Sequence, residues 1–151
     1  MRVLTRRAEE SMFESNQALV MRYYREVIHQ HQFAVLESLL GASSEFRQET
    51  REICAAYAAA FPDLEISVTE WIVTPERVVT RWKASGTHLG DFLGHAATHR
   101  RFFTSGIDIF SIAGGKIVDI WQEMNTLILL QQLGILPWLE QPGAAAQGQT
   151  A

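Results

Sequence analysis

The sequence predicts an α+β fold, with helices in the first part of the chain and an antiparallel sheet in the second. Up to about residue 60, apolar residues recur at helical spacing, whereas from Leu64 onward the chain has short runs rich in Val, Ile, Thr and Trp. Turns that carry glycine or proline separate these runs, which is typical of antiparallel hairpins. Helices first and strands afterwards is the order of an α+β domain, and no internal repeat divides the chain.

Three helices are expected before the sheet. The first spans Ala8 to about Gln30, where apolar residues follow one face and charged residues the other. A short second helix lies near Phe33–Leu40 and ends at Gly41. The third begins after Ser43 or Ser44, either of which can cap it, and ends before Pro62, which cannot continue a helix.

Four strands are expected to form the sheet: Leu64–Val73, Arg77–Gly86, about Arg101–Ile112 and Lys116–Asn125. In the first hairpin, pairing Val73 with Val78 places Glu70 opposite Arg81, and this opposite-charge pair supports the register.

The chain then closes with a short helix over Leu127–Leu133. We expect one domain over residues 1–137 and a disordered tail over 138–151, which is rich in Ala, Gly and Gln.

Composition excludes several classes of function. Asp and Glu number 17 against 13 Lys and Arg, so the net charge of −4 argues against binding to nucleic acid. No apolar run approaches the length of a membrane helix, and the first ten residues do not resemble a signal peptide. Cys54 is the only cysteine, which excludes an internal disulfide framework. These features predict a cytoplasmic protein.

The last hairpin gathers the residues that could carry chemistry. If Gly114 and Gly115 form its two-residue turn, Phe110 faces Asp119 and Asp108 faces Trp121. Strand alternation then places one aromatic and acidic set on a single face: Asp108, Phe110, Ile117, Asp119, Trp121, Glu123 and Asn125. An apolar surface with a few polar groups is what a pocket for an organic molecule requires.

Asp108 and Glu123 are the expected acid and base. As diagonal neighbours against aromatic rings, either carboxyl could have its pKa raised by burial, which suits proton transfer near neutral pH. His88 or Asn125 could donate a hydrogen bond to an enolate oxygen. The alternative interpretation is that these carboxylates face solvent or neutralise nearby arginines.

Trp82, which alternation directs toward the cavity, and Tyr24 on the first helix are further expected substrate-binding residues, together with Phe110, Trp121 and Asn125. Buried aromatic residues are more often part of the core. His88, His95 and His99 match no recognised spacing of metal ligands, so no metal is expected. No glycine-rich phosphate loop is present, and cofactor independence is the default.

Five segments resemble the SnoaL-like polyketide cyclases, a branch of the nuclear-transport-factor-like superfamily. They are Phe61–Leu64, Thr87–Gly94, Gly106–Phe110, Gly115–Val118 with Trp121, and Gln131–Gly134. The resemblance runs from the first helix to about Pro137. It implies a curved antiparallel sheet wrapped around the N-terminal helices into a cone with an internal pocket. It also implies cofactor-independent cyclisation or isomerisation of an apolar, polyketide-like molecule.

Two departures from the family favour a second hypothesis, a binding or dimerisation protein without catalysis. Asn125 occupies the position that matches the acid/base aspartate of the cyclases. Only Gly41–Glu45 separates the second and third helices, where similar proteins have a strand with polar pocket residues. The opposite face of the hairpin is aliphatic and must be buried either by helices or by a second subunit, and a homodimer is expected. This face carries Ile107, Ile109, Val118, Ile120 and Met124.

Overall fold

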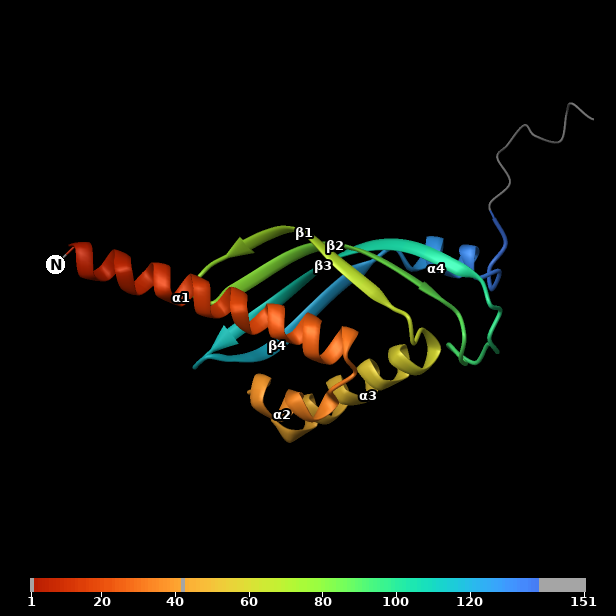
Figure 1. The fold of residues 1–151 in the computed structure, drawn as a ribbon, viewed down its shortest axis with the longest axis horizontal. Coiled ribbons are helices and arrows are strands. Elements are labelled where there is room, and N and C mark those ends of the chain that lie inside the picture. Colours follow the sequence, from red (N-terminus) through yellow and green to blue (C-terminus); the bar gives the residue numbers. More distant parts are fainter. Residues whose placement is uncertain (1, 42, 139–151) are drawn as a thin grey trace, which may run out of the picture.

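The N-terminal helices lie on one side of a curved four-stranded sheet, and the C-terminal helix lies beside one end of it (Figure 1). Its structure, a computed structural model, describes residues 2–41 and 43–138, so most of the expected disordered tail lies outside the described residues. The predicted α+β class is confirmed. The described elements are α1 Arg2–Arg22, η1 Tyr23–His29, η2 Phe33–Val35, α2 Leu36–Leu39, α3 Ser44–Ala60, β1 Glu65–Val73, β2 Arg77–Thr87, β3 Arg101–Ala113, β4 Lys116–Met124 and α4 Thr126–Gln132.

The first helix is longer than predicted and changes its pitch near its end. It starts at Arg2 rather than Ala8, since no proline or glycine interrupts the segment and Arg6 pairs with Glu10 one turn later. From Tyr23 the helix widens into the π-helix η1, in which the amide of Gln30 donates to the carbonyl of Arg25. This wider turn buries both Tyr23 and Tyr24 beneath the sheet.

The connection between α2 and α3 carries one residue of sheet pairing. Leu40 makes a single parallel bridge with Ile117, and the Gly41 amide donates to the Ile117 carbonyl at 2.8 Å. After that, Ser43 caps α3 by accepting from the Phe46 amide at 3.2 Å. Among the described residues of this connection, sheet pairing is limited to this single bridge.

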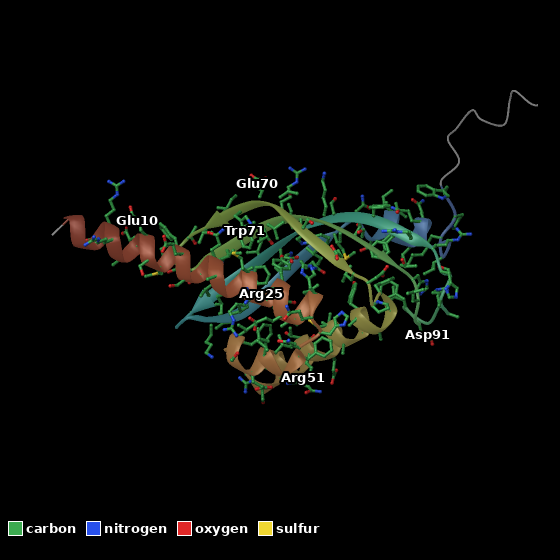
Figure 2. All side chains as sticks on the ribbon, in the orientation of Figure 1. Glu10, Arg25, Arg51, Glu70, Trp71 and Asp91 are labelled. Atoms are coloured by element: carbon green, nitrogen blue, oxygen red, sulfur yellow. The ribbon has the colours of Figure 1, made fainter. Side chains whose placement is uncertain are left out.

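The four strands pair in sequence order as an antiparallel meander. The predicted first hairpin is confirmed, because Val73 pairs with Val78 and Glu70 with Arg81. Trp71 lies on the helical side of the sheet against the ring of Tyr24, whereas Glu70 points away from the helices (Figure 2). One face of the sheet therefore packs on the helices and the other faces outward.

The predicted register of the last hairpin is wrong by one residue. Asp108 pairs with Gln122 rather than Trp121, and Phe110 pairs with Ile120 rather than Asp119. The cause is a β-bulge: Ser111 pairs with Asp119 but Ile112 pairs with Ile117, which leaves Val118 as an extra residue in β4. Because side chains alternate along a strand, one extra residue moves all later side chains of β4 to the opposite face. The expected aliphatic face is therefore wrong as well: Ile120 and Met124 lie on the helical side, whereas Ile107 and Ile109 lie on the outer side.

Candidate functional site

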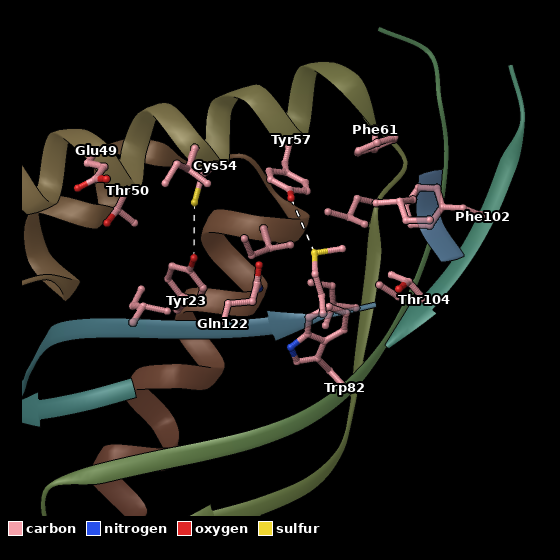
Figure 3. Close-up of a pocket in the computed structure, with 18 of the residues that line it drawn as sticks. Tyr23, Glu49, Thr50, Cys54, Tyr57, Phe61, Trp82, Phe102, Thr104 and Gln122 are labelled. Atoms are coloured by element: carbon pink, nitrogen blue, oxygen red, sulfur yellow. Dashed lines mark hydrogen bonds between the residues drawn. The ribbon is translucent and has the colours of Figure 1, made fainter. Parts of the chain in front are cut away.

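A cavity of about 310 Å³ lies between α3 and the helical side of the sheet (Figure 3). Each of the four strands contributes to its wall, together with η1 and α4. Its volume is at the lower end of the range for small-molecule sites. Much of the wall is apolar, as Ile28, Ile53, Phe61, Ile66, Trp82 and Phe102 illustrate.

A few polar groups interrupt this apolar wall. Figure 3 shows Cys54 and Tyr57 pointing from α3 toward the sheet, where Tyr23 and Met124 meet them. The Tyr23 hydroxyl and the Cys54 sulfur lie 3.5 Å apart, and the Tyr57 hydroxyl donates to the Met124 sulfur at 3.8 Å. Burial raises the pKa of the Cys54 thiol, so this cysteine is held protonated and is a poor nucleophile.

Asp108 lies directly behind this wall and is 2% exposed. Its Oδ2 accepts from the Tyr24 hydroxyl at 2.5 Å, and its Oδ1 accepts from Nε2 of Gln122 at 2.9 Å. The same Tyr24 hydroxyl lies 2.7 Å from the Thr80 hydroxyl. The carboxyl is thus fixed from two sides, by the π-helix and by β4.

Burial raises the pKa of the Asp108 carboxyl above its ordinary value. Hydrogen bonds from Tyr24 and Gln122 and the nearby indole N–H of Trp82 act in the opposite direction, and burial outweighs them. Burial and the neighbouring carboxylate also raise the pKa of Tyr24, so its hydroxyl stays a donor. A carboxyl with a raised pKa beside an apolar cavity has the properties of a general acid/base.

Comparison with known sequences identifies the family. The sequence profile of the SnoaL-like polyketide cyclases matches residues 4–133, which is most of the chain. The chain belongs to this family. No curated protein matches the chain significantly.

Solved structures place this SnoaL-like protein among related folds. TsrD from Streptomyces laurentii is 28% identical and has a TM-score of 0.72 over 82% of this chain and 97% of its own. A candidate SnoaL-like polyketide cyclase from Jannaschia sp. CCS1 is 18% identical, with a TM-score of 0.75 over 83% of this chain and 96% of its own. AclR from Streptomyces galilaeus, a candidate hydroxylase, is 22% identical and has a TM-score of 0.74 over 89% and 90% of the two chains. The latter two share the fold alone.

The predicted site residues of this SnoaL-like protein are divided between three places. Trp82 lines the cavity, whereas Tyr24 and Phe110 lie behind its wall, where their rings contact each other edge to face. Trp121 and Glu123 lie on the outer face of the sheet, and Trp121 is 62% exposed. The predicted proximity of Asp108 and Glu123 is therefore wrong, because the bulge in β4 turns Glu123 away and brings Gln122 beside Asp108.

His88 and Asn125 have positions that the sequence does not reveal. His88 is fully buried, with its ring against Phe61 and its Nδ1 accepting from the Thr98 amide at 3.2 Å. The Asn125 side chain caps α4 by accepting from the Ile128 amide at 3.2 Å. Neither residue lines the cavity beside Asp108.

Sequence reasoning missed the contribution of α3. Thr50, Cys54 and Tyr57 follow one another at spacings of four and three residues, so they share the helix face that lines the cavity. That periodicity was the available signal, but Ala-rich surroundings made the segment resemble ordinary core. Gln122 was missed because the bulge that directs it inward has no glycine or other marker in the sequence.

Two further absences concern only the described residues. Across residues 2–41 and 43–138, no three His, Cys, Asp or Glu side chains come together as a set of metal ligands. Over the same residues, no helix has both the length and the apolar character needed to cross a lipid bilayer.

Proposed function

We propose that this protein is a cofactor-independent cyclase or isomerase that binds an apolar, polyketide-like ketone in the cavity and uses Asp108 as its acid/base. The cavity supplies the apolar contact, and the family supplies the class of substrate. The observation that carries the proposal is a single buried carboxyl with a raised pKa directly behind the cavity wall.

The proposed reaction needs one carboxyl. Asp108 takes a proton from a carbon next to a carbonyl, and the electron pair of that C–H bond moves into the carbonyl to give an enolate. In cyclisation the enolate carbon attacks a second carbonyl of the same molecule, and the alkoxide that forms takes the proton back from Asp108. In isomerisation the proton returns to a different atom. Atoms and charge balance in both cases without a co-reactant.

A second candidate function is a binding protein of the same fold without catalysis. Asp108 does not itself line the cavity, and Asn125, at the position of the family aspartate, serves as a helix cap. Both observations fit a protein that keeps the cavity but performs no proton transfer.

Hydrogen–deuterium exchange distinguishes the two functions. The probe is 2-tetralone, a bicyclic ketone with acidic C–H bonds next to its carbonyl, and proton NMR in D₂O follows the loss of those signals. An acid/base enzyme accelerates exchange above the rate in buffer, and Asp108→Asn removes most of that acceleration. The matched control is Asp91→Asn, which changes an exposed aspartate in a loop (Figure 2).

Binding is measured separately by thermal shift with the same ketone. A ligand at 100 times its dissociation constant adds about 2.7 kcal/mol to the free energy of unfolding. Binding with no acceleration of exchange in the unmodified protein would favour the binding protein. Acceleration that persists in Asp108→Asn would contradict the assignment of the acid/base residue.

The protein is also proposed to be a homodimer that uses the outer face of its sheet. Ile72, Val79, Ile109 and Trp121 are cross-strand neighbours in one apolar row that crosses all four strands. Ile72 and Trp121 are 55% and 62% exposed. A row of this kind on an exposed face favours a self-complementary contact between two copies.

A further inference from the structure

One side chain separates Asp108 from the cavity and touches both. Asp108 accepts hydrogen bonds from Tyr24, which lies behind the carboxyl, and from Gln122, which lines the cavity. Nε2 of Gln122 donates to Oδ1 at 2.9 Å. Because Gln122 is an exposed residue, its amide can rotate away from Asp108 without disturbing the core.

A hydrogen-bond donor without an acceptor lies at the same place. The ring of Trp82 lines the cavity, and this residue is only 2% exposed. Its Nε1 nevertheless makes no hydrogen bond among the described residues. The indole N–H is directed at Asp108 and lowers the pKa of that carboxyl as a hydrogen-bond donor does, but it lies outside full hydrogen-bond geometry. Buried indole N–H groups normally have a partner, and an orphaned one is costly. An acceptor oxygen that arrives where Gln122 now lies would satisfy it.

We propose that the Gln122 amide is a positioning residue that covers Asp108 in the free protein, and that a ketone displaces it to reach both Asp108 and the Trp82 N–H. This inference rests on the proposed function and adds the way in which the ligand reaches the acid/base. It also defines the ligand more narrowly, as a molecule with an acidic C–H beside a carbonyl oxygen.

The two contacts match the proton transfer. The C–H of the ketone takes the place of the Gln122 N–H at Oδ1 of Asp108, and the carbonyl oxygen accepts from Nε1 of Trp82. When the proton passes to Asp108, the electron pair of the C–H bond moves onto that oxygen. The Trp82 N–H then donates to an enolate rather than a neutral carbonyl, and hydrogen bonds to charged acceptors are the stronger ones. In D₂O, the proton on Asp108 exchanges with solvent, and the deuteron that Asp108 then returns to the carbon completes one exchange.

Gln122→Ala tests the cover in the full chain, with 2-tetralone exchange as the measurement. The ligand no longer has to displace the amide, so KM falls by about tenfold, the equivalent of one hydrogen bond to a charged group, while kcat changes little. Gln48→Ala is the matched control. It removes a Gln-to-carboxylate hydrogen bond of 2.6 Å to Glu52 on the exposed side of α3 and leaves both constants unchanged.

An unchanged or higher KM in Gln122→Ala would contradict the proposal that Gln122 covers Asp108. If the role of Gln122 is purely structural, the variant should show such a KM together with lower stability. A different result would contradict the proposed function itself: an Asp108→Asn variant that catalyses exchange of 2-tetralone as fast as the unmodified protein.

Trp82→Phe tests the second contact, since it removes the N–H and keeps an aromatic ring. Affinity for 2-tetralone should fall more than affinity for tetralin, the hydrocarbon of the same ring system that lacks the oxygen. Equal losses for both ligands would overturn the contact between the carbonyl and the indole. In the unmodified protein, a downfield shift of the Trp82 indole proton on addition of 2-tetralone, but not of tetralin, is the expected NMR result, and it requires no variant.

Discussion

Asp108 depends on the residues that surround it for both its position and its proton affinity. Tyr24 and Gln122 each donate to one carboxyl oxygen, and the side chain is almost completely buried. The environment therefore favours the neutral acid more than water does, but still provides donors for the carboxylate. A group of this kind can accept and return a proton with little rearrangement.

The raised pKa of Asp108 predicts how stability depends on pH. The folded protein binds this proton more tightly than the unfolded chain, so its stability falls as pH rises from the ordinary value of 3.8 through the raised pKa. Asp108→Asn lacks this contribution. The difference in the free energy of unfolding between the unmodified protein and Asp108→Asn should therefore decrease as pH rises through this range. Above the raised pKa it should level off.

Chemical denaturation of both proteins between pH 4 and 8 measures the difference. Each unit by which the pKa is raised corresponds to about 1.4 kcal/mol. Glu26 and Asp63, whose pKa values are lowered by their partners, act in the opposite direction at lower pH, but both proteins share them. A difference that does not vary with pH would mean that the Asp108 carboxyl is not perturbed.

Gly106 gives Trp82 the space to line the cavity. A Cβ at this position would lie 2.3 Å from Cζ2 of Trp82 and 2.6 Å from the Glu123 carbonyl oxygen. Gly106→Ala should lower the free energy of unfolding by about 1–3 kcal/mol or more, because the indole or the backbone must shift. Chemical denaturation measures this loss. Ser105→Ala, which changes the neighbouring residue on the exposed face, is the control. Equal stability of the two variants would show that the indole moves freely.

At the scale of the elements, the sequence predicts the order and the approximate bounds of the helices and strands. Ser43, Pro62 and the pairing of Glu70 with Arg81 are local signals, and they place α3 and the first hairpin correctly. The β-bulge at Val118 and the π-helix from Tyr23 have no such signal, because both arise from packing between distant segments. These two irregularities decide which residues surround Asp108, so the candidate site was predicted only in part.

Asn125 stabilises the start of α4, although its sequence position made it a candidate for catalysis. As the cap of α4, it can be replaced by aspartate, which caps helices equally well, whereas Asn125→Ala should cost about 1 kcal/mol of stability. Thermal denaturation of Asn125→Asp and Asn125→Ala measures this. Equal losses in both variants would contradict the capping role, and faster ketone exchange in Asn125→Asp would indicate that this position can act on the ligand.

In the whole molecule, each face of the curved sheet forms a different surface. Its helical side forms the cavity and holds Asp108, and its outer side carries the apolar row of Ile72, Val79, Ile109 and Trp121. Since the two surfaces share strands but not side chains, assembly and ligand binding can be tested independently.

Trp121→Glu tests the proposed dimer. A charge at Trp121, the most exposed residue of the apolar row, should convert the dimer to a monomer, which light scattering coupled to size-exclusion chromatography measures. Phe103→Glu is the control. Phe103 is 64% exposed on the same sheet, but it pairs with Ser85, away from the apolar row. A dimer that persists in Trp121→Glu, or a monomeric unmodified protein, would contradict this interface.

Modification of Cys54 tests directly whether a ketone enters the cavity. This residue is the only cysteine of the chain, and its thiol lies in the cavity wall. The measurement is the rate at which a small thiol reagent modifies Cys54, followed by mass spectrometry with and without 2-tetralone, with protein unfolded in urea as the control for the reagent. We expect saturating 2-tetralone to slow modification of the folded protein and to leave the unfolded protein unaffected. An unchanged rate in the folded protein would contradict this expectation, because the ligand would then lie outside the cavity.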